Sequence, residues 1–94
     1  MEDTPRVSVW LEGLIEDADI EEDPPSARLD VTVAGRMGRR RVTVLAEGGD
    51  HVDNIRANIG NGSAVLVRAT PSERDGCDLE ADSIAFAPSH RDDA

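Results

Sequence analysis

The sequence predicts a small all-β domain with one short helix, and three observations support this fold class. Five stretches carry the β-branched residues, or the alternation of apolar and polar side chains, that are typical of strands. One stretch between the third and fourth strands carries apolar residues at helical spacing. Turns rich in glycine, proline and polar residues separate these stretches. The chain has 94 residues, the size of one domain.

The first predicted strand covers residues 7–15, where valine, isoleucine and tryptophan favour extended backbone. Gly13 inside it indicates a bulge or a sharp bend. The acidic stretch 16–26 contains two consecutive prolines and predicts a loop, with room for a short strand around Ile20.

Residues 28–34 alternate cleanly and predict a half-buried strand. A turn at 35–38 leads into a return strand at 39–45, so the two strands form a hairpin with an arginine-rich tip. The residues expected to face the core are Leu29, Val31, Val33, Val42, Val44 and Ala46.

A short helix follows the second glycine of the pair 48–49. Asp50 is the predicted N-cap, and an acidic first turn suits the helix dipole. Val52, Ile55 and Ile59 form one apolar stripe, and Gly60 is the predicted C′ residue.

Two further strands complete the domain, at 64–69 and 78–86, with a polar turn at 70–76 between them. The alternation of the last strand slips near Asp82. The order strand, strand, strand, helix, strand, strand describes a five-stranded OB-fold barrel. Closing the barrel removes exposed sheet edges, which suits a small core.

We expect one OB-fold domain over residues 7–87, with a flexible arm at 1–6 and a short polar tail at 88–94. No apolar run reaches the roughly 18 residues of a membrane span. The acidic N-terminus lacks the apolar region of a signal peptide. We therefore expect a cytoplasmic protein without a membrane partner.

The net charge is −10, from 20 acids and 10 bases, and all the bases are arginine. The charge is segregated: residues 1–30 carry −8, residues 31–68 carry +3 and residues 69–94 carry −5. A uniformly acidic chain would repel nucleic acid, whereas a positive middle segment allows contact with it. The lysine-free, Asp-rich composition suggests either a GC-rich genome or a salt-loving cell.

Three stretches follow the pattern of a known protein family. They are 9–13, a strand that ends in glycine, and 42–49 and 61–67 on either side of the helix. Here the domain resembles the bacterial single-stranded DNA-binding protein family, with Gly49 and Gly62 on family glycines. The resemblance implies an OB-fold, binding of single-stranded DNA, and a homodimer or homotetramer formed through first-strand pairing and sheet stacking.

The sequence departs from that family at several positions. Val42 and Gly48 stand where the family stacks bases on aromatic rings, and Asn61 stands where lysine is common. The family's acidic tail with a terminal phenylalanine has no counterpart in residues 88–94. We therefore expect weak binding of single-stranded DNA and no recruitment of protein partners through such a tail.

Four arginines on the hairpin tip are the main candidates for nucleic-acid contact. OB-folds bind strands across their second and third strands, and guanidinium groups pair with phosphates and stack on bases. The alternative is a solvated hairpin that pairs with the acidic stretch 16–23 or with a partner subunit. The candidate residues are Arg36, Arg39, Arg40 and Arg41.

Trp10, Arg68 and Arg74 are the remaining candidates for nucleic-acid contact. Stacking of a base on Trp10 would contribute about 1–3 kcal/mol, although a place in the barrel core or in a subunit interface is the alternative. Arg68 lies on the fourth strand and Arg74 in the loop after it, where a local ion pair with neighbouring acids is the alternative. Phe86 is predicted to be core.

No catalytic, cofactor or metal site is predicted. The stretch 16–23 resembles a calcium loop in charge only, since Glu22 stands where an EF-hand requires glycine. His51, His90 and Cys77 lack metal-ligand spacing, and one cysteine excludes an internal disulfide. We therefore expect a protein that is not an enzyme.

Two functions remain open. The first is non-sequence-specific binding of single-stranded DNA in replication, recombination or repair, with a possible replication or recombination protein partner. The second is an OB-fold interaction module, similar to the primosomal replication protein or to a DNA mimic, which does not bind DNA. Arginines and Trp10 on the outer face of the second and third strands would favour DNA, and acids would favour a protein partner.

Overall fold

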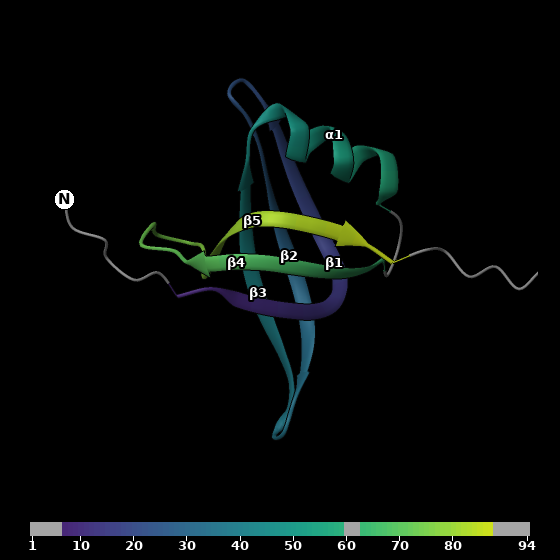
Figure 1. Ribbon diagram of the computed structural model, residues 1–94, viewed down its shortest axis with the longest axis vertical. Coiled ribbons are helices and arrows are strands. Elements are labelled where there is room, and N and C mark those ends of the chain that lie inside the picture. Colours follow the sequence, from purple (N-terminus) through teal and green to yellow (C-terminus); the bar gives the residue numbers. More distant parts are fainter. Residues whose placement is uncertain (1–6, 60–62, 88–94) are drawn as a thin grey trace, which may run out of the picture.

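The computed structural model describes residues 7–59 and 63–87 as five strands and one helix (Figure 1). They are β1 (Val9–Glu22), β2 (Pro25–Gly35), β3 (Gly38–Glu47), α1 (Gly49–Asn58), β4 (Ala64–Pro71) and β5 (Leu79–Phe86). The strands close into a barrel in the order β1-β2-β3-β5-β4. The predicted five-stranded OB-fold barrel with one helix between β3 and β4 is confirmed. The predicted arm at 1–6 and tail at 88–94 lie outside the described residues.

β1 is much longer than predicted, and the acidic stretch 16–23 is not a loop. From Asp17, opposite Asp30, the strand pairs with β2 to its end. The predicted loop is therefore wrong, and the turn between the two strands consists only of Asp23 and Pro24.

β1 bends sharply where it passes from one half of the barrel to the other (Figure 1). Its partner strand changes next to Gly13. Val9 to Leu14 pair with β4, and the strand pairs with β2 from Leu14 onward. A Cβ atom on Gly13 would lie 2.5 Å from the backbone oxygen of Thr32 and 2.6 Å from Cγ1 of Val31. Glycine is therefore required at this close approach of two backbones.

Two β-bulges adjust the register of the sheet. In β1 the pairing with β2 skips Glu16. In β5 the pairing skips Asp82, opposite the step from Arg68 to Ala69 in β4. The predicted slip of alternation near Asp82 is confirmed, since one extra residue moves every later side chain to the other face.

The hydrophobic core fills the barrel and extends beneath α1. The predicted residues Leu29, Val31, Val44 and Ala46 are fully buried, while Val33 and Val42 are half-buried against them. No charged or polar residue is buried within residues 7–59 and 63–87. The buried residues are Leu11, Ile15, Ala27, Leu29, Val31, Val44, Leu45, Ala46, Val52, Ile55, Val65, Val67, Ala69 and Ile84.

The N-cap of α1 is Gly48 and not Asp50 as predicted. Gly48 has φ 116° and makes no side-chain cap hydrogen bond, whereas Asp50 lies in the first turn of the helix. There its charge still interacts favourably with the helix dipole. Arg56 in the last turn pairs with the carboxylate of Glu22, which joins α1 to the end of β1. The predicted C′ residue Gly60 lies outside the described residues.

Replacement of Gly13 by alanine is expected to destabilise the fold by roughly 1–3 kcal/mol, the usual cost of overpacking. The backbone of Thr32 cannot retreat without breaking the β1–β2 pairing. Gly49→Ala is the matched control, because a Cβ there meets no atom within 4 Å. Urea unfolding followed by circular dichroism measures both free energies. Equal stability of the two variants would contradict this role of Gly13.

Asp17 and Asp30 lie directly opposite each other on β1 and β2. Opposed like charges destabilise a sheet, so Asp17→Asn should raise the free energy of unfolding by roughly 0.2–1 kcal/mol at low salt. The gain should disappear at 1 M salt, where the Debye length is about 3 Å. Denaturant titrations at both ionic strengths test this, with Glu73→Gln in the β4–β5 loop as control. A gain that is independent of salt would argue against charge repulsion.

Candidate nucleic-acid interface

The β2–β3 hairpin extends beyond the barrel (Figure 1), and four arginines lie on this extension. Arg36 and Met37 form its turn, and Met37 is 92% exposed. We refer to residues 32–41 as the arginine arm. The four predicted arginines are all exposed on it: Arg36, Arg39, Arg40 and Arg41.

The register of the hairpin decides where each arginine points. Arg39 lies opposite Ala34 and Arg41 opposite Thr32, so these two arginines share the outer face of the arm. Arg40 lies opposite Val33 on the other face. Positive charge therefore surrounds the arm instead of lining one side of it.

Arg41 has an acidic neighbour on the barrel. Its Nη2 atom lies 3.6 Å from Oε1 of Glu16, and the other carboxylate oxygen of Glu16 accepts a hydrogen bond from the hydroxyl of Thr32. Arg36, Arg39 and Arg40 form no ion pair with any residue in 7–59 or 63–87. Among the four arm arginines, the expected alternative of pairing with the acidic stretch 16–23 thus holds for Arg41 alone within the described residues.

Trp10 lies on the outer surface of β1, and its side chain is 62% exposed. The alternative that it fills the barrel core is therefore wrong, whereas Phe86 does pack against the core as predicted. Trp10 lies directly opposite the exposed Arg68 of β4. Directly opposed side chains on one face have Cβ atoms about 5 Å apart, close enough for an indole and a guanidinium to contact one ligand together.

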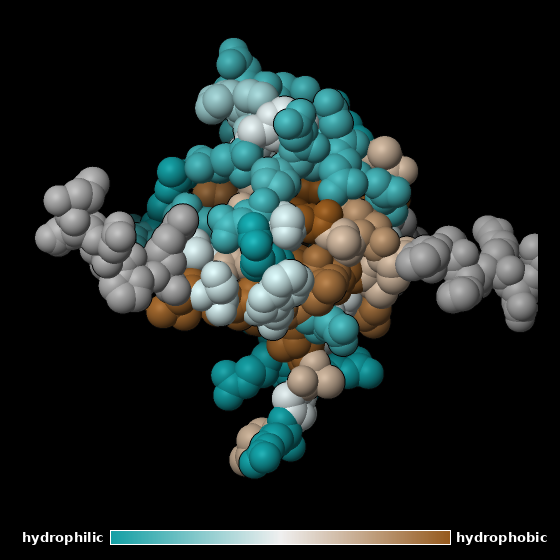
Figure 2. Space-filling model, viewed as in Figure 1, coloured by the Kyte–Doolittle hydropathy of each residue, from teal (hydrophilic) through white to brown (hydrophobic). Residues whose placement is uncertain are grey.

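An apolar groove separates the Trp10–Arg68 pair from the arginine arm. Its volume is about 720 Å³, and Figure 2 shows the apolar surface over β4 and β5, between the hydrophilic helix and the tip of the arm. Leu14 and Leu66 remain 49% and 37% exposed on this face. The groove is lined by Glu12, Gly13, Leu14, Glu16, Thr32, Ala34, Arg39, Ala64, Val65, Leu66, Ala85, Phe86 and Ala87.

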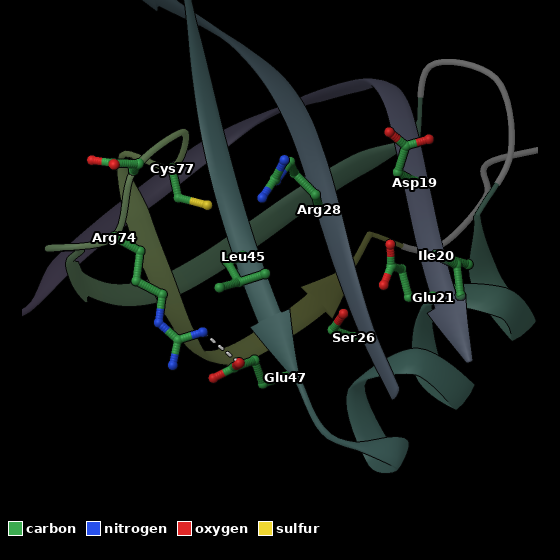
Figure 3. Close-up of a pocket in the computed structure, with 10 residues that line it drawn as sticks. Asp19, Ile20, Glu21, Ser26, Arg28, Leu45, Glu47, Arg74 and Cys77 are labelled. Atoms are coloured by element: carbon green, nitrogen blue, oxygen red, sulfur yellow. Dashed lines mark hydrogen bonds and ion pairs between the residues drawn. The ribbon is translucent and has the colours of Figure 1, made fainter. Parts of the chain in front are cut away.

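Arg74 is held by two glutamates on the strands beside its loop, of which Figure 3 shows Glu47. Its Nη1 atom lies 2.6 Å from Oε2 of Glu47, and its Nε atom lies 3.7 Å from Oε2 of Glu80. The hydrogen bond to Glu47 raises the pKa of Arg74 above its ordinary value. The alternative of a local ion pair with the neighbouring acids of the loop is wrong, because the partners of Arg74 lie on β3 and β5.

The base of the outer β1–β2–β3 face is acidic. A hollow of about 530 Å³ lies there. Asp19, Glu21 and Glu47 line it together with Arg28 and Arg74 (Figure 3). We define the acidic floor as the carboxylate-bearing residues of this face and its adjoining loop: Asp17, Asp19, Glu21, Asp30, Glu47 and Asp75. This surface was not predicted, because its β1 acids were expected to lie in a loop.

The outer face of β2 and β3 therefore carries both signs of charge, at different ends. Arg39 and Arg41 lie toward the tip, and the acidic floor lies toward the base. Trp10 lies on the separate outer face of β1 and β4. The structure brings the four arm arginines together, pairs Trp10 with Arg68, and places Arg74 apart from both.

Within the described residues, no group of three or more histidine, cysteine, aspartate or glutamate side chains is arranged to hold a metal ion. None of the described helices is long and apolar enough to cross a membrane.

Two solved structures share this fold. The small single-stranded DNA-binding protein from Streptomyces coelicolor superposes with a TM-score of 0.71 at 16% identity, over 89% of this chain and 96% of its own. The second single-stranded DNA-binding protein from Mycobacterium smegmatis gives a TM-score of 0.66 at 17% identity, over 92% and 99%. The similarity in structure to bacterial single-stranded DNA-binding proteins thus extends over nearly the whole chain. No protein-family profile and no curated protein sequence matches the chain.

Proposed function

We propose that this protein binds single-stranded DNA without sequence specificity, as a non-enzymatic cytoplasmic protein of replication, recombination or repair. The observation that carries the proposal is the arginine arm. In a chain of net charge −10, three arginines without an ion pair in the described structure stand together on a hairpin that leaves the barrel. The single-stranded DNA-binding proteins that share the fold support this assignment.

The mechanism is electrostatic. Guanidinium groups on the arm pair with phosphates in a bidentate fashion, and counterions released from the strand favour binding. Because arginines surround the arm and few aromatic rings are available, the strand is held by its backbone more than by its bases. Trp10 and Arg68 offer one place where a base can stack, and Arg74 contributes little because two glutamates already hold it.

The second candidate function is an OB-fold interaction module that does not bind DNA. The acidic floor favours it, because the base of the face where OB-folds bind strands carries carboxylates that suit a basic protein. The two functions differ in whether the arm is needed for the interaction.

We also propose that the protein forms a homodimer or homotetramer through the outer face of β1 and β4. The β1 segment Val9–Gly13 pairs with β4 along one edge and has no strand partner on its other edge within the described residues. Such an edge can pair with a second copy. Leu14 and Leu66 expose apolar surface on the same face, which a second copy would bury.

The strand-binding proposal predicts that oligo-dT binding depends on the arm. Arg36→Ala/Arg39→Ala/Arg40→Ala should weaken binding and flatten the dependence of log K on log salt by about 2, at roughly 0.7 per lost phosphate contact. Arg28→Ala/Arg56→Ala/Arg74→Ala removes the same charge away from the arm and should change that slope little.

Fluorescence anisotropy of labelled oligo-dT at several salt concentrations measures both effects, and quenching of Trp10 reports a nearby base. Equal losses in the two triple variants would mean that net charge alone controls binding. Absence of binding at every salt concentration would favour the interaction module.

The oligomer proposal predicts that the purified chain has the mass of a dimer or tetramer by light scattering. Leu66→Asp places a charge at the centre of the exposed apolar face and should convert the protein to monomers that remain folded by circular dichroism. Glu73→Asp in the β4–β5 loop is the control and should keep the wild-type mass. A monomeric wild type at high concentration would exclude this interface.

A further inference from the structure

We infer that the acidic floor confines the bound strand to the arginine arm, so that the binding footprint is short. This inference rests on the proposed function and specifies where on the OB-fold face the strand lies. The outer face of β1, β2 and β3 is one continuous surface, but its charge changes sign along the strands.

The register shows where the sign changes. Toward the tip, Ala34 lies opposite Arg39 and Thr32 opposite Arg41. The next row of outward-facing residues toward the base contains Asp17 of β1 and Asp30 of β2, which lie opposite each other. Rows on one face are about 7 Å apart along a strand, which is within the Debye length of about 8 Å at physiological salt. A phosphate that follows the face beyond Arg41 therefore enters a negative potential.

The arginines at the base do not offset the acidic floor. Arg74 is engaged by Glu47 and Glu80. Arg28 lies directly opposite Asp19 on the neighbouring strand. Asp19, Glu21 and Asp75 form no ion pair within the described residues, and Arg28 offsets at most one of these three charges, so the hollow keeps a net negative charge.

The boundary itself is built into the structure. The bulge in β1 leaves Glu16 without a cross-strand partner, and its carboxylate lies between Thr32 and Arg41 at the root of the arm. A carboxylate at this point occupies one side of the last arm arginine and repels a phosphate that would continue past it. The bound single-stranded DNA is thus limited to the arm and to the residues beside the arm.

OB-folds occupy about 4–16 nucleotides of single strand. A track limited to the arm corresponds to the lower end of that range. A tetranucleotide should therefore make most of the contacts that one protomer offers, and neutralising the acidic floor should lengthen the track.

The test compares a floor variant with a matched control. Asp19→Asn/Glu21→Gln/Asp75→Asn removes three exposed carboxylates of the acidic floor that form no ion pair in the described structure. Asp50→Asn/Asp53→Asn/Asp82→Asn removes three exposed carboxylates from α1 and β5. Anisotropy titrations use labelled dT4 and dT16 at low salt and at 1 M salt.

The floor variant should bind dT16 about tenfold more tightly than wild type at low salt, because each removed charge about 8 Å from a phosphate contributes roughly twofold. Its affinity for dT4 should stay within about twofold of wild type, and the gain should vanish at 1 M salt. The control variant should change both oligonucleotides equally and less.

Equal gains for dT4 and dT16, gains no larger than in the control, or an unchanged affinity for dT16 would overturn the inference while leaving the proposed function intact. If wild type binds neither oligonucleotide but the floor variant binds dT16, the floor is confirmed as a barrier. If neither protein binds either oligonucleotide, the proposed function fails and the inference fails with it.

Discussion

The architecture depends on the close approach of two backbones at Gly13. Because no Cβ stands between it and the backbone of Thr32, β1 can turn from β4 toward β2 and belong to both halves of the barrel. The same turn creates the arm. From Val33 onward β2 has lost β1 as a neighbour, so β2 and β3 continue as a two-stranded hairpin. The unpaired edge of Val9–Gly13 is the other product of this bend.

The alternation of inward and outward side chains along the strands determines where the charges of the molecule lie. Ala18 and Ile20 turn toward the core, so the acids between and around them must face outward. Arg39 and Arg41 emerge on the same outer face by the same rule. Opposite charges therefore share a face and are separated only by distance along the strands, which allows a very acidic protein to present a basic surface.

Sequence patterns predicted the element order, the arginine hairpin and the slip at Asp82, because each depends on local alternation or on turn residues. Only a short strand around Ile20 was expected in the second half of β1, because Ala18 and Ile20 are a weak apolar signal among acids. The side of Trp10 was ambiguous because Val9 and Leu11 are also apolar, and the burial of Leu11 decides it. The partners of Arg74 could not be predicted from the sequence. Glu47 lies 27 positions away and contacts Arg74 only when β3 and the β4–β5 loop come together.

The placement of charge at the two ends of β2 makes the protein a large electric dipole. β2 has 11 residues, roughly 36 Å at 3.3 Å per residue. Glu21, Glu22 and Asp23 lie beside the start of β2. The arginine arm lies at its other end (Figure 1). The net charge repels an approaching polyanion, but the field of that polyanion also exerts a torque on the dipole. The torque turns the arm of the molecule toward the polyanion before contact.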